Sequence, residues 1–159
     1  MATTEKMSKT TTPTHWDADI PVNYVYTYGL AGEAFFRAIK DRGTFLGTRC
    51  DACDITYVPP KAYCDRCLEA LDKYIDVGTV GYVDTFTVSF KNMDGSEKPR
   101  PRILAMIKIE GTDGGIIHYL DGISIEEVAL GLPVQAIFKP KAQRKGGIED
   151  IIGFGPVKR

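Results

Sequence analysis

The sequence predicts a mainly β protein that opens with an N-terminal helix, continues through a small cysteine-rich module and ends in a five-stranded barrel. Three observations predict this order. Apolar residues recur at helical spacing ahead of residue 43, all four cysteines fall between 50 and 67, and short runs of alternating polarity follow from 78 onward. We therefore expect four segments: a flexible tail over 1–23, an aromatic arm and helix over 24–43, the cysteine module over 44–76 and the barrel over 77–159.

Composition and charge limit what kind of protein this is. The chain has 159 residues, of which 43% are hydrophobic and 26% charged, and 20 basic against 21 acidic residues give a net charge of −1. This balance argues against a bulk nucleic-acid binder. No apolar run approaches the roughly 18 residues of a membrane span, and the first dozen residues lack the apolar core of a secretory signal. We therefore expect a cytoplasmic protein with no membrane partner, in a compartment where clustered cysteines bind metal more often than they pair.

An aromatic arm and an amphipathic helix come first. Tyr24, Tyr26 and Tyr28 alternate as in an extended segment, and apolar residues then recur near helical spacing at Leu30, Ala34, Phe35, Ala38 and Ile39. Arg42 and Gly43 are typical of a helix C-terminus, so we expect a helix from about 30 to 41. Its aromatic face has to be buried either on the chain's own core or on a partner, and the sequence leaves both open.

The stretch CDACDITYVPPKAYCDRC contains the four cysteines Cys50, Cys53, Cys64 and Cys67 in the spacing C-x₂-C-x₁₀-C-x₂-C. Two C-x-x-C hairpins supply the four corners of a tetrahedron, and zinc is bound by such thiolates at about 2.3 Å. Four thiolates leave no position for water or substrate, so the predicted rubredoxin-like zinc ribbon holds a structural Zn²⁺. Iron in a rubredoxin-type site uses the same ligands, and a disulfide framework also fits four cysteines, although it suits a secreted protein.

Five strand-like runs follow the module, at 78–90, 102–111, 114–123, 132–140 and 147–157. The sequence GTDGG predicts a tight hairpin between the second and third. SIEEVALG predicts a short helical turn before the fourth, with Ser124 and Glu127 as a capping box and Gly131 at its end. This order is that of an OB-fold, a small Greek-key barrel. Gly78 and Gly81 suit the sharp bend that the first strand of such a barrel needs.

The residues contain no recognisable catalytic constellation. Of the two histidines, His15 lies in the polar tail, and His118 lies within the third strand run, where a single histidine is usually structural. The motifs G-x-S-x-G, G-x-G-x-x-G and the P-loop are missing. The carboxylate pairs at 126–127 and 149–150 suit a helix N-terminus and a solvated strand end. We therefore expect no catalytic residue and no catalysis by this chain alone.

Two loops of the predicted barrel, which we expect to be neighbours, carry positive charge at the places where OB-folds present ligands. The cations are Lys91, Lys98, Arg100 and Arg102 in or beside the first loop, and Lys141, Arg144 and Lys145 in the second. They are either solvated loop residues or a lip that faces a partner or phosphate, in a single-stranded nucleic acid or an acyl-CoA. For nucleic acid, Tyr82, Phe86 and Phe90 offer a stacking platform if they share an outer face, but the same spacing fits the barrel interior.

The order of these parts resembles a known family. After the helix, the stretches LGTRCDACDITYVPPKAYCDRC, GTVGYVDTFTV, ILAMIKIEGTDGGIIHYLDG and LGLPVQAIFKP are similar to the zinc-ribbon and OB-fold proteins that accompany thiolases and related acyl-CoA enzymes, long classed as a domain of unknown function. The resemblance covers about residues 30–157. The chain is also similar to the small subunits of thiolases that cleave 2-benzoylsuccinyl-CoA in anaerobic toluene degradation.

The resemblance implies a non-catalytic subunit of a hetero-oligomer that cleaves a 3-oxoacyl-CoA. Its ribbon and helix dock on a thiolase-fold subunit, which holds the catalytic Cys and His, and the small subunit helps to shape or cover the acyl-CoA site. Only the four cysteines carry over, as zinc ligands. Asp54 departs from the pattern, because many ribbons have Gly after the second cysteine, where a positive φ is needed. The alternative function is a ribbon and OB-fold module that binds single-stranded nucleic acid.

Overall fold

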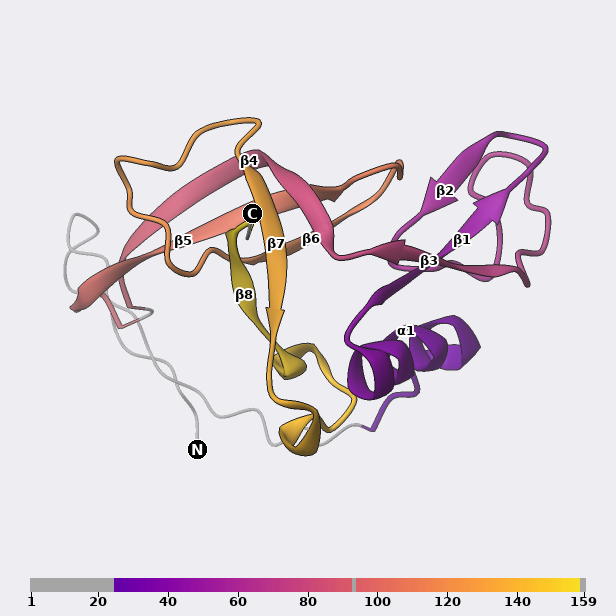
Figure 1. Ribbon diagram of the computed structural model, residues 1–159, viewed down its shortest axis with the longest axis horizontal. Helices are drawn as coiled ribbons and strands as arrows, with labels where there is room; N and C mark the ends of the chain where they lie inside the picture. The colour runs from indigo at the N-terminus through magenta and orange to yellow at the C-terminus, as the bar shows by residue number, and fades with distance from the viewer. Residues whose placement is uncertain (1–24, 93, 158–159) are drawn as a thin grey trace, which may run out of the picture.

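The computed structural model describes residues 25–92 and 94–157, which form one helix and two antiparallel sheets (Figure 1). The tail predicted over 1–23, with His15, and the first tyrosine of the arm, Tyr24, lie outside these residues. Within the described residues, none of the helices is long and apolar enough to span a membrane.

The helix α1 covers Gly29–Arg42 and confirms the predicted helix, with about one more residue at each end. It buries Phe35, Ala38 and Ile39 against the rest of the chain. Gly43 ends it in the left-handed conformation, at φ 71°, and its N–H donates to the carbonyls of Ala38 and Ile39 at 3.0 Å. A residue with a Cβ is strained at such a φ, which is why glycine is favoured there. The helix thus packs mainly on the chain's own core.

The three-stranded sheet contains the cysteine module. Its strands are β1 (Phe45–Cys50), β2 (Ile55–Tyr57) and β3 (Tyr74–Gly78), in the order β2-β1-β3. The first cysteine pair lies at the turn from β1 to β2, and the second lies in the long connection from β2 to β3. This sheet is too small to bury much apolar surface, so other interactions have to stabilise it.

The five-stranded sheet confirms the predicted barrel strands. They are β4 (Val80–Lys91), β5 (Glu97–Ile109), β6 (Gly115–Tyr119), β7 (Pro133–Phe138) and β8 (Ile151–Pro156), in the order β6-β5-β4-β7-β8. A parallel bridge between Leu120 and Phe154 joins the two outer strands. The order and the closure are those of an OB-fold. Gly81 allows β5 to approach, because a Cβ there would lie 2.2 Å from the carbonyl oxygen of Lys108.

The predicted short helical turn after Ser124 is present: the Val128 N–H donates to the Ser124 carbonyl at 3.1 Å, and the Ser124 N–H donates to the Glu127 carboxylate at 3.0 Å, as in a capping box. The last connection differs from the sequence prediction. The fifth predicted strand begins later than 147, because residues Ile148–Asp150 form the short 3₁₀ helix η2. A second 3₁₀ helix, η1, covers Lys141–Gln143. Both lie in the loop between β7 and β8.

Phe45 joins the helix, the small sheet and the barrel into one core. Its ring is fully buried and lies 5.8 Å from the ring of Phe35 in α1, 5.4 Å from Phe138 in β7 and 6.0 Å from Phe154 in β8. Val58 of the cysteine module belongs to the same buried cluster. The ribbon and the barrel therefore share a hydrophobic core.

Backbone hydrogen bonds hold the β5–β6 turn on the ribbon. The Asp113 N–H donates to the Thr56 carbonyl at 2.9 Å, and the Gly115 N–H donates to the Val58 carbonyl at 3.1 Å. The Thr56 N–H in turn donates to the Asp113 carboxylate at 2.8 Å. Gly114 is needed for this approach, because a Cβ there would lie 2.3 Å from the Val58 oxygen. The predicted GTDGG hairpin is therefore also the contact between the two units.

Candidate metal centre and its surroundings

The four cysteine sulfurs converge on one point of the ribbon. The Sγ atoms of Cys50, Cys53, Cys64 and Cys67 all lie within 4.8 Å of one another, and those of Cys50 and Cys67 are 3.5 Å apart. Four sulfurs around a zinc ion at about 2.3 Å would be about 3.8 Å apart. Cys50 and Cys64 are buried, Cys53 is half-buried and Cys67 is exposed. The donors fit one tetrahedral metal ion, and they would fill all four positions around it.

The backbone after each cysteine pair adopts the turn that such a site needs. Asp54 has φ 55° and Leu68 has φ 61°, and they are the non-glycine residues with positive φ in the described part of the chain. Each follows the second cysteine of its pair. Asp54 also pairs with Arg49. The comparison with other zinc ribbons singled out Asp54 but did not identify Leu68, although Leu68 follows Cys67 just as Asp54 follows Cys53.

Hydrogen bonds favour the thiolate form of Cys64. The Tyr57 hydroxyl donates to the Cys64 sulfur at 3.3 Å and accepts from the Asp65 N–H at 3.1 Å, while the Arg66 N–H donates to the same sulfur at 3.4 Å. The bond from Tyr57, followed by backbone N–H groups, lowers the pKa of Cys64 to about 6. The same bond raises the pKa of Tyr57 to about 12, because the phenol would have to give up the proton that it donates. Tyr57 is thus a functional residue of the metal centre that the cysteine spacing did not reveal.

Two of the other cysteines retain their protons more strongly. The hydrogen bond between Cys53 and Cys67, together with burial, raises the pKa of Cys53 to about 12, and burial raises the pKa of Cys50. At neutral pH the shell therefore holds a thiolate at Cys64 beside protonated thiols at Cys50 and Cys53. A metal ion has to displace those protons, so its binding releases protons and weakens as the pH falls. The bound ion would hold the two hairpins together, and the full shell leaves no site on it for substrate.

The seven cations predicted to face phosphate or a partner do not form one surface. Figure 1 shows the end of the β4–β5 hairpin on the left, whereas the β7–β8 loop lies below the barrel, beside α1. The expectation of two neighbouring loops is therefore wrong. In the first group, Lys91, Arg100 and Arg102 are exposed and Lys98 is half-buried. The Arg102 guanidinium stacks over the Tyr119 ring at 3.5 Å.

In the β7–β8 loop, Arg144 makes internal contacts. Its guanidinium donates to the Lys139 carbonyl at 2.6 Å and to the Ile39 carbonyl, in the last turn of α1, at 3.2 Å. The N–H groups of Lys145 and Gly146 donate to the buried carboxylate of Asp150. Burial opposes ionisation of Asp150, but these N–H groups outweigh it and lower its pKa. The backbone donors that phosphate would need are therefore already used.

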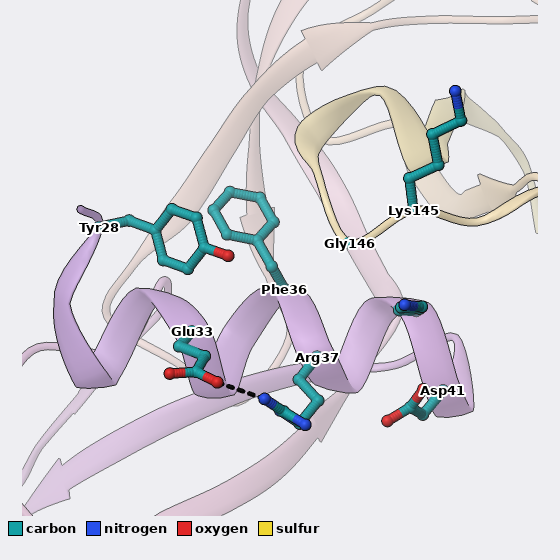
Figure 2. Close-up of a pocket in the computed structure, with 8 residues that line it drawn as sticks. Tyr28, Glu33, Phe36, Arg37, Asp41, Lys145 and Gly146 are labelled. Atoms are coloured by element: carbon teal, nitrogen blue, oxygen red, sulfur yellow. Dashed lines mark hydrogen bonds and ion pairs between the residues drawn. The ribbon is translucent and has the colours of Figure 1, made fainter. Parts of the chain in front are cut away.

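A groove beside this loop is lined in part by Lys145, whose side chain extends away from α1 (Figure 2). It lies between α1 and residues 145–146, and Tyr28 and Phe36 contact each other edge to face at 5.3 Å on one side of it. Glu33 forms an ion pair with Arg37 on the helix surface. The volume is about 160 Å³, below the roughly 300–1,000 Å³ of small-molecule sites. Lys141 is exposed nearby, in η1.

A β-bulge divides the three aromatic residues of β4. Val83 pairs with the buried Ile107 and points into the barrel. Because successive side chains of a strand alternate, its neighbour Tyr82 points outward. The register then shifts between residues 83 and 85, which places Phe86 opposite the buried Ala105 on the barrel side. Phe90 lies at a second register shift, between residues 89 and 91, and has no paired residue on β5. The prediction of one shared face is therefore wrong. A three-ring stacking platform for nucleic acid is not formed on this strand.

His118 lies on the barrel side of β6, opposite Ala105. Its ring contacts those of Tyr119 and Phe154, and its Nδ1 atom is buried without a hydrogen-bond partner. Burial, and next the charge of Arg102, lower the pKa of His118, which keeps the ring neutral near pH 7. These surroundings are those of a packing residue.

Comparisons with known proteins agree with this architecture. Residues 37–72 match the family of the rubredoxin-like zinc ribbon domain of ChsH2, and residues 74–139 match the family of its C-terminal OB-fold domain. A DUF35 domain-containing scaffold protein of Methanocaldococcus jannaschii is 27% identical over 121 residues, which cover 76% of this chain and 84% of that protein.

Two solved structures have the same fold. One is a DUF35 family protein of unknown function from Sulfolobus solfataricus, with a TM-score of 0.60 and 27% identity, covering 69% of this chain and 78% of that one. The other is a chain of the Ltp2-ChsH2(DUF35) aldolase, with a TM-score of 0.60 and 20% identity, covering 83% of this chain and 98% of that one. The two matched domains cover every residue from 37 to 139 except Lys73. The chain therefore belongs to the DUF35 family, whose members join a ChsH2-type zinc ribbon to an OB-fold domain.

Proposed function

We propose that this chain is the non-catalytic, zinc-containing subunit of a thiolase-type complex that cleaves a 3-oxoacyl-CoA. The observation that carries the proposal is the closed metal centre, in which four cysteine sulfurs lie within 4.8 Å of one another. A metal ion with four thiolates has no position for substrate, so it stabilises a shape rather than a transition state. A protein braced in this way is suited to present a surface to another protein.

The rest of the described chain supports an accessory role. Three of its titratable groups serve packing and turns: His118 is packed in the barrel, Asp150 holds a loop, and Glu127 closes a turn. Grooves on the described surface, such as those lined by residues 101–103 or by Gly122 and Pro156, measure about 320–340 Å³. These volumes are at the lower end for a small ligand. An acyl-CoA would therefore need walls from a second subunit.

The relatives point in the same direction. The Methanocaldococcus jannaschii protein is described as a scaffold, and the Ltp2-ChsH2(DUF35) structure is described as an aldolase. Aldolases and thiolases both cleave a carbon–carbon bond next to a carbonyl carbon. We therefore assign the catalytic Cys and His to a thiolase-fold partner. We take 2-benzoylsuccinyl-CoA as the first substrate to test, because the chain is similar to the small subunits of thiolases that act on it.

The proposal is tested by affinity purification of the tagged chain from its native host, followed by mass spectrometry of the bound proteins. We expect a thiolase-fold acyl-CoA enzyme in a fixed ratio to the bait and one zinc ion per chain. The control for the zinc content is the variant Cys50→Ser/Cys53→Ser, which should lose the zinc. Recovery of the chain without any acyl-CoA enzyme would refute the proposal.

A further inference from the structure

The far halves of β4 and β5 project from the barrel as a two-stranded ribbon. β7 pairs with β4 only at residues 80–82, and β6 pairs with β5 only at residues 104–108. Within the described chain, residues 84–91 and 97–102 therefore have no strand partner outside β4 and β5, whereas the carbonyl of Ile103 accepts from the Leu120 N–H at 3.0 Å. Figure 1 shows the two segments reaching beyond the other strands on the left of the molecule. A two-stranded ribbon is only marginally stable in water by itself. We call this segment, residues 84–91 and 97–102, the projecting ribbon.

One face of the projecting ribbon carries the uncovered aromatic ring of Phe86, and Phe90 is exposed at the second register shift of the same strand. After the bulge, Phe86 and Val88 lie opposite Ala105 and Ile103, which are buried, so they share the face that forms the core elsewhere in the barrel. The barrel does not extend far enough to cover them. Phe86 is 37% exposed and Phe90 is 56% exposed. Aromatic residues that face the core side of a sheet without a core above them are typical of a surface that another molecule covers.

Positively charged side chains lie on the projecting ribbon beside its exposed aromatic residues. Lys91, Arg100 and Arg102 are exposed on the same two strands, and the half-buried Lys98 donates to the Ser89 hydroxyl at 2.9 Å. Of the acids in the segment, Asp94 is engaged by its own turn, since its carboxylate accepts from the N–H and hydroxyl of Ser96. The segment over 89–102 thus has four cations against two acids, in a chain whose net charge is −1. The partner surface that complements this segment is an apolar patch bordered by carboxylates.

The projecting ribbon favours a folded protein surface over nucleic acid or an added strand. Phe86 and Phe90 are about 13 Å apart along the strand, too far to stack on adjacent bases, and Tyr82 points to the other face. Pro99 and Pro101 have no N–H, so β5 lacks two donors that a strand added along it would require. Along the β5 edge, contact through side chains is what remains.

We infer that the projecting ribbon is the docking surface of this chain for its partner enzyme, with Phe86 and Phe90 in an apolar depression and Lys91 and Arg100 against surrounding carboxylates. The inference rests on the proposed function and adds the surface and the partner chemistry to it. Aromatic residues that become buried at the centre of an interface supply most of its binding energy, and charges at its rim mainly set the association rate.

The experiment measures the affinity of the purified full-length chain for the acyl-CoA enzyme recovered with it from the host. We expect Phe86→Ser/Phe90→Ser to weaken binding at least about 100-fold and Lys91→Glu/Arg100→Glu to weaken it about 10-fold, with a smaller dependence on salt. Tyr82→Ser is the matched control, because Tyr82 is 43% exposed on the opposite face of the same strand. It should bind within about threefold of the unmodified chain, and a circular-dichroism spectrum equal to that of the unmodified chain confirms the fold of each variant.

The outcomes separate the inference from the proposed function. If the unmodified chain binds an acyl-CoA enzyme and Phe86→Ser/Phe90→Ser binds it equally well, the docking inference is wrong and the proposed function stands. If the unmodified chain binds no such enzyme, both are wrong. Self-association, or binding of a labelled single-stranded oligonucleotide, that disappears in Phe86→Ser/Phe90→Ser would also overturn the inference, in favour of a second copy or of nucleic acid.

Discussion

Tyr57 connects the metal centre to the rest of the fold. Its ring is 9% exposed, with the Lys61 ammonium 4.8 Å from the ring centre, and its hydroxyl donates to the Cys64 sulfur. The next residue, Val58, belongs to the main core and accepts a hydrogen bond from Gly115 of the barrel. A hydrogen bond to a metal-bound sulfur fixes the position of that ligand and reduces its charge. One side chain thus links a ligand to the strand that carries the contact with the barrel.

Replacing Tyr57 by Phe should weaken zinc binding while leaving the fold intact. The ring stays buried, but the Cys64 thiolate loses the hydrogen bond that most lowers its pKa. Loss of such a partner typically costs 10- to 100-fold in metal affinity. Competition with a coloured chelator measures the effect. Tyr63→Phe is the control, because Tyr63 is exposed on the same ribbon, and equal affinities for the two variants would contradict the role of the Tyr57 hydroxyl.

The surroundings of His118 predict that stability falls in mild acid. Burial lowers the pKa of His118 in the folded protein below its usual value near 6.5. The unfolded chain then binds the proton more readily, so the contribution is fully present above about pH 6.5 and is lost as the pH falls below it. Urea unfolding between pH 7.5 and 5.5 should show the unmodified protein losing stability relative to His118→Gln. Parallel pH profiles of the two proteins would exclude His118 as the cause.

At the scale of elements, the packing of Phe45 holds α1, β7 and β8 together. Phe45→Ala should lower the free energy of unfolding by about 3–5 kcal/mol, through lost burial and the cavity left among three other rings. Ile152→Ala is the control, since Ile152 is about half exposed in β8 and should cost less than about 1 kcal/mol. Urea denaturation followed by circular dichroism measures both. A loss below about 1 kcal/mol for Phe45→Ala would show that the three elements do not share one core.

Periodicity predicted the elements well, because burial on one face imposes it. The helix occurs where apolar residues recur at helical spacing, and the five barrel strands occur within the runs where apolar residues alternate. The β4 bulge was not predictable, since one extra residue in a strand changes neither composition nor propensity, yet it turns Tyr82 away from Phe86. The role of Arg144 was also hidden, because its acceptor on Ile39 lies 105 residues away in the sequence.

The metal centre was predictable for a different reason. Cysteine spacing is a local property, and two C-x-x-C hairpins bring four sulfurs together with few alternatives. The hydrogen bond from Tyr57 depends on how β2 runs past the second hairpin, which the spacing does not contain. Leu68 in the left-handed conformation was missed because leucine is rarely found there.

At the scale of the whole molecule, the metal centre and the projecting ribbon lie at opposite ends, with the shared core between them (Figure 1). The small cluster around the cysteines contains Cys50, Tyr57, Cys64 and Leu71 and is separate from the main core. A cluster of this size cannot hold the two hairpins by burial alone. The metal ion should therefore stabilise the zinc ribbon, and the stability of the barrel should depend on the metal much less.

Removal of the metal with a chelator should unfold the zinc ribbon before the barrel. We expect amide hydrogen exchange to rise strongly over residues 50–72, while amides of β4, β5 and β7 keep most of their protection, because they belong to the main core. Mass spectrometry of exchanged peptides measures this, and added Zn²⁺ should restore protection in the same sample. Loss of protection throughout the barrel at the same chelator concentration would show that the metal stabilises the whole chain instead.

We propose above that this chain supports catalysis by a partner and performs none itself. A thiolysis assay with a 3-oxoacyl-CoA, beginning with 2-benzoylsuccinyl-CoA, tests it most directly when run on the chain, on its co-purified thiolase-fold partner and on the two together. We expect no turnover by the chain, little by the partner and full activity only from the combination. Turnover by the purified chain, or equal activity of the partner with and without it, would contradict the account.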